Sequence, residues 1–242
     1  TVGMRNIRHA LDLAGVRRIL TADMLVQRLK TQGVEFGDLT ERFVMMERMR
    51  QEFTVLEKLS AFLRARFAWG SLRRARISPI AAVLFTSGSE SLPKAVPLTH
   101  ANVLANIRDV LRVVDVRADD RMIGFLPPFH SFGLSDTTAL PLCLGLPVVH
   151  YPNPTESATL ARLVESHGVT LLIGTPTFLN GIVRAAQSGQ LRTLRLAVTG
   201  AEKCSERVYA ALTAACPGAT VLEGYGVTEC SPIVSVNSDR AP

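Results

Sequence analysis

Short apolar runs alternate with longer stretches of helical periodicity along most of the chain. Each run has the length of one strand, and they lie at residues 81–85, 122–126, 147–150, 169–173, 194–198 and 219–222. Most of them are apolar throughout instead of alternating with polar residues, which is typical of strands covered on both faces. The pattern predicts parallel strands in an α/β layer structure.

Helical spacing is clearest at residues 101–114, where one stripe contains Val103, Leu104, Ile107, Val110, Leu111 and Val114. Thr99 and His100 precede this stripe and are interpreted as capping residues. Further helices are expected at about 132–144, 155–167, 176–188 and 204–215. The alternation of strand and helix predicts a doubly wound, mostly parallel sheet with flanking helices.

The first 79 residues follow a different pattern. A helix is expected near 5–14, a strand at 16–20 and polar helical stretches at 22–31 and 54–67, whereas residues 32–52 are the least readable. We therefore expect a helical, basic leading segment at 1–79 and a doubly wound core at 80–242.

Charge separates the same two parts, because residues 1–79 carry +7 and residues 80–242 carry −1. The densest basic run is interpreted first as a solvated helix end and linker, and second as a patch for acidic lipid or protein: Arg64, Arg66, Arg73, Arg74 and Arg76. No nucleic-acid motif accompanies the run, so nucleic acid is not expected as a partner.

The cysteines and histidines suggest neither disulfides nor a zinc site. Cys143, Cys204, Cys216 and Cys230 form no C-x-x-C pair and lie in contexts typical of buried thiols, which favours a reducing, cytoplasmic location. His9, His150 and His167 share no metal-ligand spacing. Neither a signal peptide nor an apolar membrane span is expected, and the abrupt ends suggest an excerpt from a longer protein.

A hydroxyl-rich loop, residues 86–96, follows the first apolar run and contains one glycine and one lysine, Lys94. Successive main-chain N–H groups, hydroxyls and a lysine suit a polyphosphate. The loop is neither a Walker loop nor a nucleophile elbow, since G-x-x-x-x-G-K-[ST] and G-x-S-x-G both fail to match. Composition alone favours an ordinary serine-rich turn between two strands.

Three further motifs follow in order: Leu-Pro-Pro-Phe-His-Ser-Phe-Gly at 126–133, Val-Thr-Gly-Ala-Glu-Lys at 198–203 and Gly-Tyr-Gly-Val-Thr-Glu at 224–229. With the loop, they resemble the motifs of the acyl-adenylate-forming (AMP-binding) superfamily. The T-S-G-S-E and T-G-A-E-K forms are most similar to the acyl-ACP synthetase part of bifunctional 2-acylglycerophosphoethanolamine acyltransferases. The fold implied is a partial acyl-CoA synthetase-like N-terminal domain.

The resemblance implies a ligase that activates a fatty acid with ATP and Mg²⁺ and transfers it to a carrier thiol, for phospholipid acylation. Acyl carrier protein and coenzyme A both remain open as acceptors. Peripheral membrane association through fused domains, at the inner face of the membrane, is left open as well. The alternative is a catalytically degenerate module that binds lipid or a protein partner.

The resemblance also implies roles for individual residues. The β- and γ-phosphates would be held by Thr86, Ser87, Gly88, Ser89, Ser91 and Lys94. Thr228 would contact the α-phosphate, and Glu229 would hold Mg²⁺, although a surface acid is its ordinary interpretation. The adenine would be flanked by Tyr225 and by the main chain of Gly200, Ala201 and Glu202, and Gly224 and Gly226 would also bind the nucleotide. Without the resemblance, a tyrosine between two glycines usually marks a turn. His130 would lie by the acyl carboxylate or the α-phosphate, or be a hydrogen-bonded histidine at a strand end.

Two loop residues depart from the superfamily pattern, because Ser91 and Ala95 stand where glycine is usual. A requirement for positive φ at either position would strain the loop by about 1–2 kcal/mol and weaken ATP binding. We expect a ribose-binding aspartate, a hinge and a C-terminal lid domain with a catalytic lysine to be missing after Pro242. The 242-residue chain alone is therefore expected to bind nucleotide weakly and to show no turnover.

Overall fold

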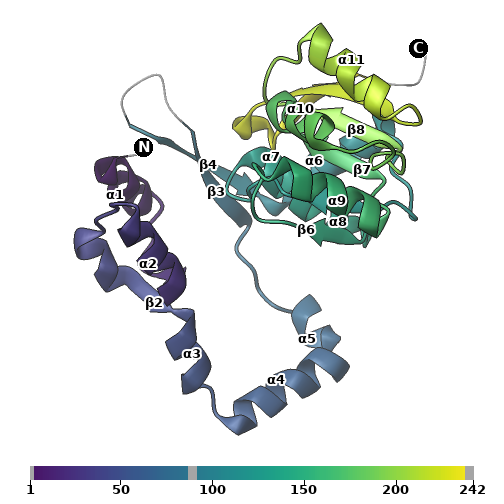
Figure 1. Cartoon of the computed structure of the whole chain (residues 1–242). Coiled ribbons are helices and arrows are strands. Elements are labelled where there is room, and N and C mark those ends of the chain that lie inside the picture. Colours follow the sequence, from purple (N-terminus) through teal and green to yellow (C-terminus); the bar gives the residue numbers. More distant parts are fainter. Residues whose placement is uncertain (1–2, 87–91, 238–242) are drawn as a thin grey trace. The chain divides into compact units, whose positions relative to one another are not determined.

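The computed structural model describes residues 3–86 and 92–237, leaving aside the side chains of residues 71 and 72. The chain divides into two compact units (Figure 1). The first unit contains residues 1–78 and 85–95, and the second contains residues 79–84 and 96–242. Each unit is considered by itself.

The first unit is mostly helical. In chain order its elements are α1 (Met4–Leu13), β1 (Ile19–Thr21), α2 (Asp23–Thr31), the 3₁₀ helix η1 (Gly37–Arg42), β2 (Phe43–Met45), α3 (Met46–Glu52), α4 (Val55–Phe67) and α5 (Trp69–Arg73). The helices expected at 5–14, 22–31 and 54–67 are confirmed. The poorly patterned residues 32–52 contain η1, β2 and α3, which have six, three and seven residues and are too short to repeat a pattern several times.

A small packed region forms around the parallel pair β1–β2, in which Ile19 is opposite Phe43. Val26 and Leu39 are buried beside it, and the rings of Phe36 and Phe43 meet edge to face at 5.2 Å. The strand expected at 16–20 begins only at Ile19.

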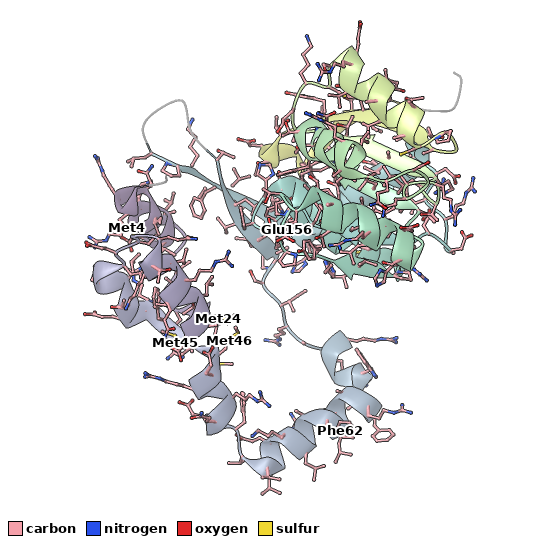
Figure 2. The ribbon with its side chains drawn as sticks, in the orientation of Figure 1. Met4, Met24, Met45, Met46, Phe62 and Glu156 are labelled. Atoms are coloured by element: carbon pink, nitrogen blue, oxygen red, sulfur yellow. The ribbon has the colours of Figure 1, made fainter. Side chains whose placement is uncertain are left out.

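The helix α4 exposes most of its apolar side chains. Phe62 projects from the helix in Figure 2 and is 65% exposed, and Leu56 is 78% exposed. The arginines of the basic run are exposed as well, in agreement with a solvated helix end and linker. Among the described residues, no helix combines the length and the apolar character needed to cross a membrane.

The second unit contains a six-stranded sheet with the order β10-β9-β8-β7-β5-β6. All neighbouring strands are parallel except β10, which is antiparallel to β9. The strands are β5 (Met122–Gly124), β6 (Val148–His150), β7 (Leu171–Gly174), β8 (Leu196–Thr199), β9 (Thr220–Gly226) and β10 (Ile233–Val236). The predicted α/β fold with a mostly parallel sheet is confirmed.

Helical segments connect these strands. They are α6 (His100–Val113), α7 (Ser131–Leu134), the π turn η2 (Ser135–Ala139), α8 (Leu140–Leu144), α9 (Ser157–His167), α10 (Pro176–Ala185), α11 (Glu206–Ala215) and the 3₁₀ turn η3 (Thr228–Cys230). Thr99 caps α6 in a reciprocal box with Asn102, as expected for a capping residue, while His100 is the first helical residue.

Alternation along β7 and β8 assigns side chains to the two faces of the sheet. Leu172 and Ala197 are completely buried on one face, where the helices α9, α10 and α11 pack next to one another and bury Leu160, Leu179 and Leu212. The residues of opposite parity face the other way, toward α6. The core therefore lies on both faces of the sheet, as the continuous apolar runs predicted.

The apolar run at 81–85 does not join this sheet. It forms β3 (Ile80–Thr86), which pairs with β4 (Lys94–Thr99) in a separate two-stranded sheet. Only Leu84 of β3 is buried. The expectation of a strand covered on both faces is wrong here, because apolar composition reports the strand but not its partner. Strands β4 and β10 were not anticipated.

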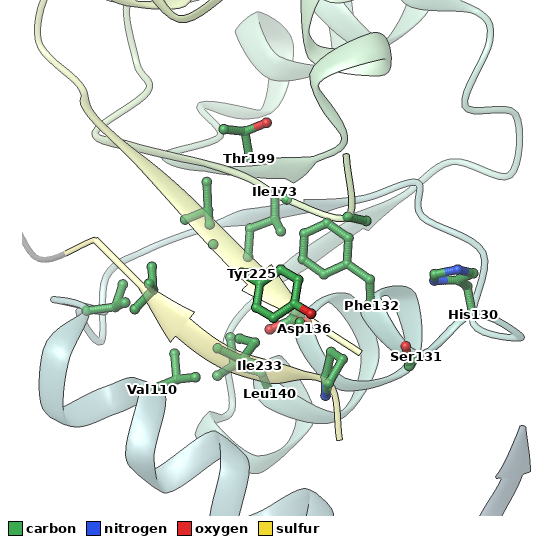
Figure 3. A pocket seen from close by; sticks show the side chains of 18 of the residues that line it. Val110, His130, Ser131, Phe132, Asp136, Leu140, Ile173, Thr199, Tyr225 and Ile233 are labelled. Atoms are coloured by element: carbon green, nitrogen blue, oxygen red, sulfur yellow. The ribbon is translucent and has the colours of Figure 1, made fainter. Parts of the chain in front are cut away.

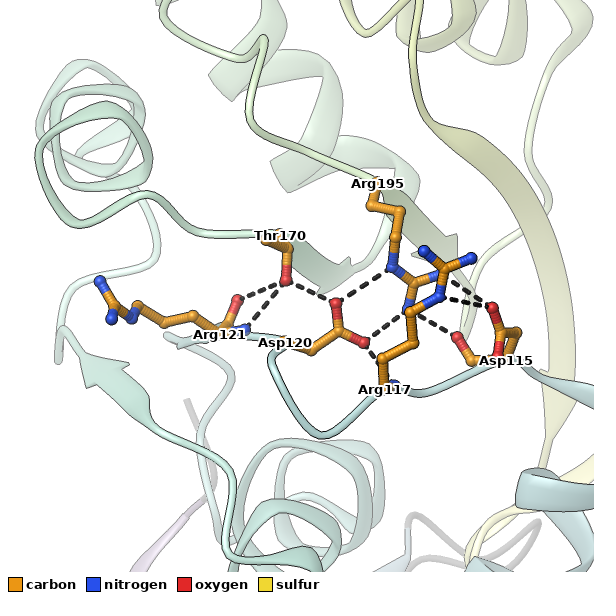
Figure 4. A network of polar contacts seen from close by, with 6 residues as sticks. All are labelled: Asp115, Arg117, Asp120, Arg121, Thr170 and Arg195. Carbon is orange, nitrogen blue, oxygen red and sulfur yellow. Dashed lines mark hydrogen bonds and ion pairs between the residues drawn. The ribbon is translucent and has the colours of Figure 1, made fainter.

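A polar network joins the amino ends of three strands of the main sheet (Figure 4). Asp120 precedes β5 and is 2% exposed; it accepts hydrogen bonds from Thr170 Oγ1 at 2.7 Å, Arg195 Nε at 3.1 Å and the main-chain N–H of Arg117 at 2.7 Å. Burial raises the pKa of Asp120, but these hydrogen bonds outweigh it and the pKa is lowered. The network ties together the segments that enter β5, β7 and β8.

Two cysteines differ from expectation. Cys216 is buried, and burial raises its pKa to about 11, whereas Cys143 and Cys230 are exposed. The prediction that all four are buried is wrong for these two, since small or apolar neighbours in sequence do not determine which face of an element meets solvent.

Candidate functional site

The carboxyl ends of the parallel strands define the edge where a ligand site is expected. The chain passes from β5 to β6 on one side and then returns to β7 on the other side of β5. Such a change of direction opens a crevice beyond the carboxyl ends of the strands. Three of the four motifs follow or end strands at this edge.

The motif at 126–133 makes the turn that follows β5. A Cβ atom on Gly133 would lie 2.1 Å from the carbonyl oxygen of Pro127, so only glycine permits this close approach of α7. His130 precedes α7 with an exposed ring, and its main-chain N–H donates to Pro127 at 3.1 Å. The motif therefore positions His130 at the start of a helix.

The motif at 198–203 ends β8 and turns sharply. Ala201 adopts φ = 65°, a left-handed conformation that costs a non-glycine residue about 1 kcal/mol. Such strain is typically found at functional sites. Next to it, Glu202 accepts a hydrogen bond from Thr177 Oγ1 at 2.6 Å, which ties the turn to α10.

The motif at 224–229 forms the end of β9 and the turn η3. A Cβ atom on Gly226 would lie 2.5 Å from the carbonyl oxygen of Pro232. Thr228 Oγ1 and Ser131 Oγ lie 3.2 Å apart, which links η3 to α7. Asn106 of α6 hydrogen-bonds both main-chain groups of Ile233 and holds β10 against α6.

These segments surround one cavity of about 150 Å³ (Figure 3). It brings together seven residues that the sequence predicted for the site, and the polar groups among them define what is called its polar end: His130, Gly200, Ala201, Gly224, Tyr225, Gly226 and Thr228. Most of the other lining residues are apolar and come from α6 and from one face of the sheet, among them Val110, Val114, Leu171, Ile173, Leu196 and Val198. The cavity can accept a ligand that is polar at one end and apolar along its length.

A second cavity, of about 450 Å³, shares Ala201, Gly224, Tyr225 and Gly226 with the first and is also lined by Glu202 and Lys203. The Tyr225 ring is 61% exposed and available for stacking. An added Cβ at Gly200 would come within 3.1 Å of the Gly224 carbonyl oxygen, so the main chains meet there without side chains between them. An aromatic face beside a bare main-chain surface fits the flat base of a nucleotide.

The predicted phosphate loop is only partly described. Thr86 ends β3 and Lys94 begins β4 with an exposed side chain, both in the first unit, whereas Ser87, Gly88, Ser89 and Ser91 lie outside the described residues. Ala95 lies within β4 and is not among the non-glycine residues with positive φ. The anticipated strain at Ala95 is therefore not found in the strand.

Glu229 lies in η3 and is exposed. Among the described residues, no three acidic, histidine or cysteine side chains gather into a metal-binding group. One carboxylate with oxygen ligands from a nucleotide nevertheless suits Mg²⁺, which retains waters and needs few protein ligands. The donor present fits a magnesium ion that arrives with a nucleotide and not a preformed metal cage.

The sequence did not nominate Ser131, Asp136 or Thr199, which also line the first cavity. Ser131 directly follows His130, and Thr199 directly precedes Gly200, so both lie inside or beside recognised motifs. Asp136 is an acid within the apolar stretch expected to form helix 132–144. That interruption is the one local signal that could have identified it.

Comparison with known proteins identifies similar chains. A long-chain-fatty-acid–CoA ligase of Bacillus subtilis is 29% identical over 162 residues, which are 65% of this chain and 29% of the relative. A 4-coumarate–CoA ligase of Oryza sativa subsp. japonica is 28% identical over 163 residues, again 65% of this chain and 29% of the relative. The chain thus spans less than a third of the length of these relatives.

Solved structures share the fold. The nonribosomal peptide synthetase FmoA3 superimposes with a TM-score of 0.74 at 24% identity, covering 100% of this chain and 24% of that one. ATP-bound MatB from Rhodopseudomonas palustris superimposes with a TM-score of 0.58 at 26% identity, covering 69% of this chain and 33% of that one. The family model of the AMP-binding enzymes matches residues 1–242, and the chain belongs to the AMP-binding enzyme family.

Proposed function

We propose that this chain is the nucleotide- and acid-binding part of a ligase that activates a fatty acid with ATP and passes the acyl group to a carrier thiol. The observation that carries the proposal is the first cavity, which joins motif residues from three distant segments to an apolar wall. Its polar end suits a reacting carboxylate and phosphate, and its apolar wall suits a hydrocarbon chain. Similarity to a fatty-acid–CoA ligase supports the same class of reaction.

In the proposed reaction, a carboxylate oxygen attacks the α-phosphorus of ATP and the bond to pyrophosphate breaks, leaving an acyl-adenylate. A thiolate then attacks the acyl carbonyl, and AMP leaves. Little covalent work falls to the protein, whose side chains orient the reactants and neutralise charge. Thr228 donates to the α-phosphate, His130 orients the carboxylate, and Tyr225 stacks on the adenine.

The phosphate loop supplies the remaining contacts in this proposal. Main-chain N–H groups and hydroxyls of residues 86–91 donate to the β- and γ-phosphates, and Lys94 adds a positive charge. Bound Mg²⁺, held by Glu229, supplies further charge neutralisation.

We further propose acyl carrier protein or coenzyme A as the acceptor, and phospholipid acylation in the cytoplasm, at the inner face of the membrane, as the use of the product. The T-S-G-S-E and T-G-A-E-K forms of two motifs support this narrower assignment. The low coverage of the relatives supports catalysis by a longer protein, with the 242-residue chain inactive by itself.

The test is fatty-acid-dependent exchange of pyrophosphate into ATP by the full-length natural protein. We expect exchange that requires the fatty acid and that falls by at least about a hundredfold in Lys94→Met and Glu229→Gln variants, because each removes charge stabilisation from the transition state. Matched controls are Lys58→Met on α4 and Glu206→Gln on α11, both exposed residues whose loss should leave exchange unchanged.

Folded protein that shows no exchange with any fatty acid would contradict the proposal and favour a binding module without catalysis. Exchange that survives in both Lys94→Met and Glu229→Gln would contradict the assigned roles. Addition of coenzyme A or acyl carrier protein to the active protein then identifies the acceptor by the thioester formed.

A further inference from the structure

Asp136 places a carboxyl group inside the first cavity, where the surrounding wall is largely apolar. Its side chain is 5% exposed, and Oδ2 has no hydrogen-bond partner. In the described part of the chain, only one other buried side-chain oxygen lacks a hydrogen-bond partner. It is Thr199 Oγ1, and Thr199 lines the same cavity. The unpartnered buried oxygens are thus concentrated at one cavity.

The neighbours of Asp136 in sequence are all hydrogen-bonded. Ser135 Oγ donates to the carbonyl oxygen of Ser231 at 2.8 Å, and Thr137 and Thr138 both donate to the carbonyl oxygen of Gly133 at 3.0 Å. These bonds hold the π turn η2, and π turns inside helices are frequent at functional sites. All the hydroxyls of this turn are thus hydrogen-bonded, whereas its acid, Asp136, lines the cavity (Figure 3).

An unpartnered carboxyl in such a place has a cost that a ligand can remove. Burial without a hydrogen bond costs a polar group about 1–3 kcal/mol in proteins. The other titratable groups that line the cavity are His130 and Tyr225. Burial raises the pKa of Asp136 to about 8, so the carboxyl is neutral at pH 7 and can both donate and accept a hydrogen bond.

We propose that Asp136 is a specificity-determining residue that hydrogen-bonds a hydroxyl group on the chain of the carboxylic acid substrate. The inference rests on the proposed function and names the class of acid, a hydroxy acid in place of a plain hydrocarbon acid. A hydroxyl matches a neutral carboxyl, because each group donates and accepts. An ammonium group would require two desolvated charges in an apolar cavity, which is costlier.

The position of Asp136 indicates where the hydroxyl lies along the chain of the acid. In the view of Figure 3, Asp136 lies between His130, at the polar end, and Val110, on α6. The reacting carboxylate belongs beside His130 and Thr228 in the proposed reaction. The hydroxyl is therefore part-way along the hydrocarbon chain and not on the carbon next to the carboxylate.

The test uses pyrophosphate exchange by the full-length protein with straight-chain acids of one length, unsubstituted or with a single hydroxyl moved carbon by carbon. We expect one hydroxyl position to raise kcat/KM over the unsubstituted acid by about tenfold or more, because the unsubstituted acid leaves Asp136 unpaired. Asp136→Val should abolish this preference and raise kcat/KM for the unsubstituted acid. Asp136→Asn, which keeps a donor and an acceptor, should retain part of it.

Leu140→Val is the matched control, since Leu140 lines the same cavity on the same helical segment. It should change kcat/KM for both acids by the same factor and leave their ratio as in the wild type. Thermal melting of each variant establishes that it is folded. If Asp136→Val does not fold, Asp136→Asn is used to measure the change in preference.

The inference is overturned if every hydroxy acid is a poorer substrate than the unsubstituted acid, or if neither Asp136 variant changes the ratio. A preference for amino acids over hydroxy acids that is lost in Asp136→Asn contradicts a hydroxyl as the group bound by Asp136. It indicates a charged ammonium partner instead. Exchange with unsubstituted acids alone refutes only the inference. Absence of exchange with any acid refutes the proposed function, and the inference with it.

Discussion

Gly226 illustrates how single positions in the motifs depend on close main-chain contacts. Any Cβ atom there would lie 2.5 Å from the Pro232 carbonyl oxygen, at the point where β9 ends and β10 returns. At Gly218, in contrast, no heavy atom lies within 4 Å of the place that a Cβ atom would occupy. A side chain is therefore excluded at Gly226 by a main-chain contact, whereas no contact excludes one at Gly218.

Gly226→Ala is expected to lower the free energy of unfolding by about 2 kcal/mol or more, because main-chain atoms at such a distance must move. The displaced turn should also reduce pyrophosphate exchange. Urea denaturation and the exchange assay measure the two effects. Gly218→Ala is the control and should change either quantity little; equal effects of the two substitutions would contradict the contact as the cause.

Asp136 predicts a dependence of stability on pH. Its pKa is raised to about 8 in the folded protein, from 3.8 in an unfolded chain. As pH rises through this window the unfolded state loses its proton while the folded state keeps it, so stability is highest at acidic pH and declines until about pH 8. The decline from this group is about 4 kcal/mol between pH 5 and pH 8, at roughly 1.4 kcal/mol per pH unit.

The measurement is urea denaturation of the wild type and of Asp136→Asn at pH 5, 6, 7 and 8. Other titrating groups are common to both proteins and cancel in the difference. The stability of the variant relative to the wild type should grow steadily with pH. A difference that stays constant over this range would show that the carboxyl is already ionised when buried.

Among the elements of the second unit, the parallel strands carry groups of different kinds at their two ends. Motif residues occupy the carboxyl edge, and the Asp120–Arg195 network occupies the amino edge (Figure 4). In the described part of the chain the network joins the segments before β5, β7 and β8, and it touches neither cavity. Its role is to hold the strands in register beneath the site.

Arg195→Met is expected to reduce the free energy of unfolding by about 3–5 kcal/mol, because it leaves the buried carboxylate of Asp120 without its charged partner. Chemical denaturation at pH 7 measures the loss. The double variant Asp120→Asn, Arg195→Met should recover part of it. Arg112→Met is the control: its ion pair with Asp109 is 72% and 64% exposed, so the change should be within about 0.5 kcal/mol. An equal loss in both single variants would contradict the role of burial.

The stability that Asp120 contributes has the opposite pH dependence to that of Asp136. Its folded pKa is lowered, so its contribution is complete above the ordinary aspartate pKa of 3.8 and is lost as pH falls below it. Acid therefore weakens the amino edge of the sheet while it relieves the cost of Asp136.

In the whole molecule, the chain passes from the first compact unit to the second between residues 78 and 79, and it crosses between the units again at 84/85 and 95/96. The segment 74–79 spans the first of these crossings. This segment contains no helix or strand, and all its residues are exposed. It also contains two arginines of the basic run, Arg74 and Arg76. Exposed main chain without regular structure is where proteases cut first.

Brief digestion with trypsin is expected to cut after Arg74 or Arg76 before cutting inside α6 or α9. Mass spectrometry should find early products that begin at Ala75 or Ile77. A variant with Arg73, Arg74 and Arg76 all changed to Gln should lose these products and otherwise remain intact for longer. First cuts within the second unit would contradict a boundary at this place.

Local patterns in the sequence were sufficient for much of the fold. Continuous apolar runs predicted the parallel strands, and the apolar stripe at 101–114 predicted α6, because burial on a sheet imposes these periods on the residues themselves. The motifs predicted which segments surround the cavity. The residues of the phosphate loop at 87–91 lie outside the described residues, and their roles stay predictions.

Other features depend on contacts between residues far apart in the chain, and no local pattern contains them. The apolar sequence of β3 predicts a strand of the core sheet, yet β3 pairs with β4 in a two-stranded sheet. An apolar run indicates a strand but not which strand it pairs with. Asp136 and Asp120 look alike in sequence, but folding brings hydrogen-bond donors from three residues to Asp120 and none to Oδ2 of Asp136. Burial disfavours the charged form of both carboxyls. Donors from distant segments offset this cost for Asp120, which is a structural anion, whereas Asp136 lacks such donors and is a neutral acid inside a cavity.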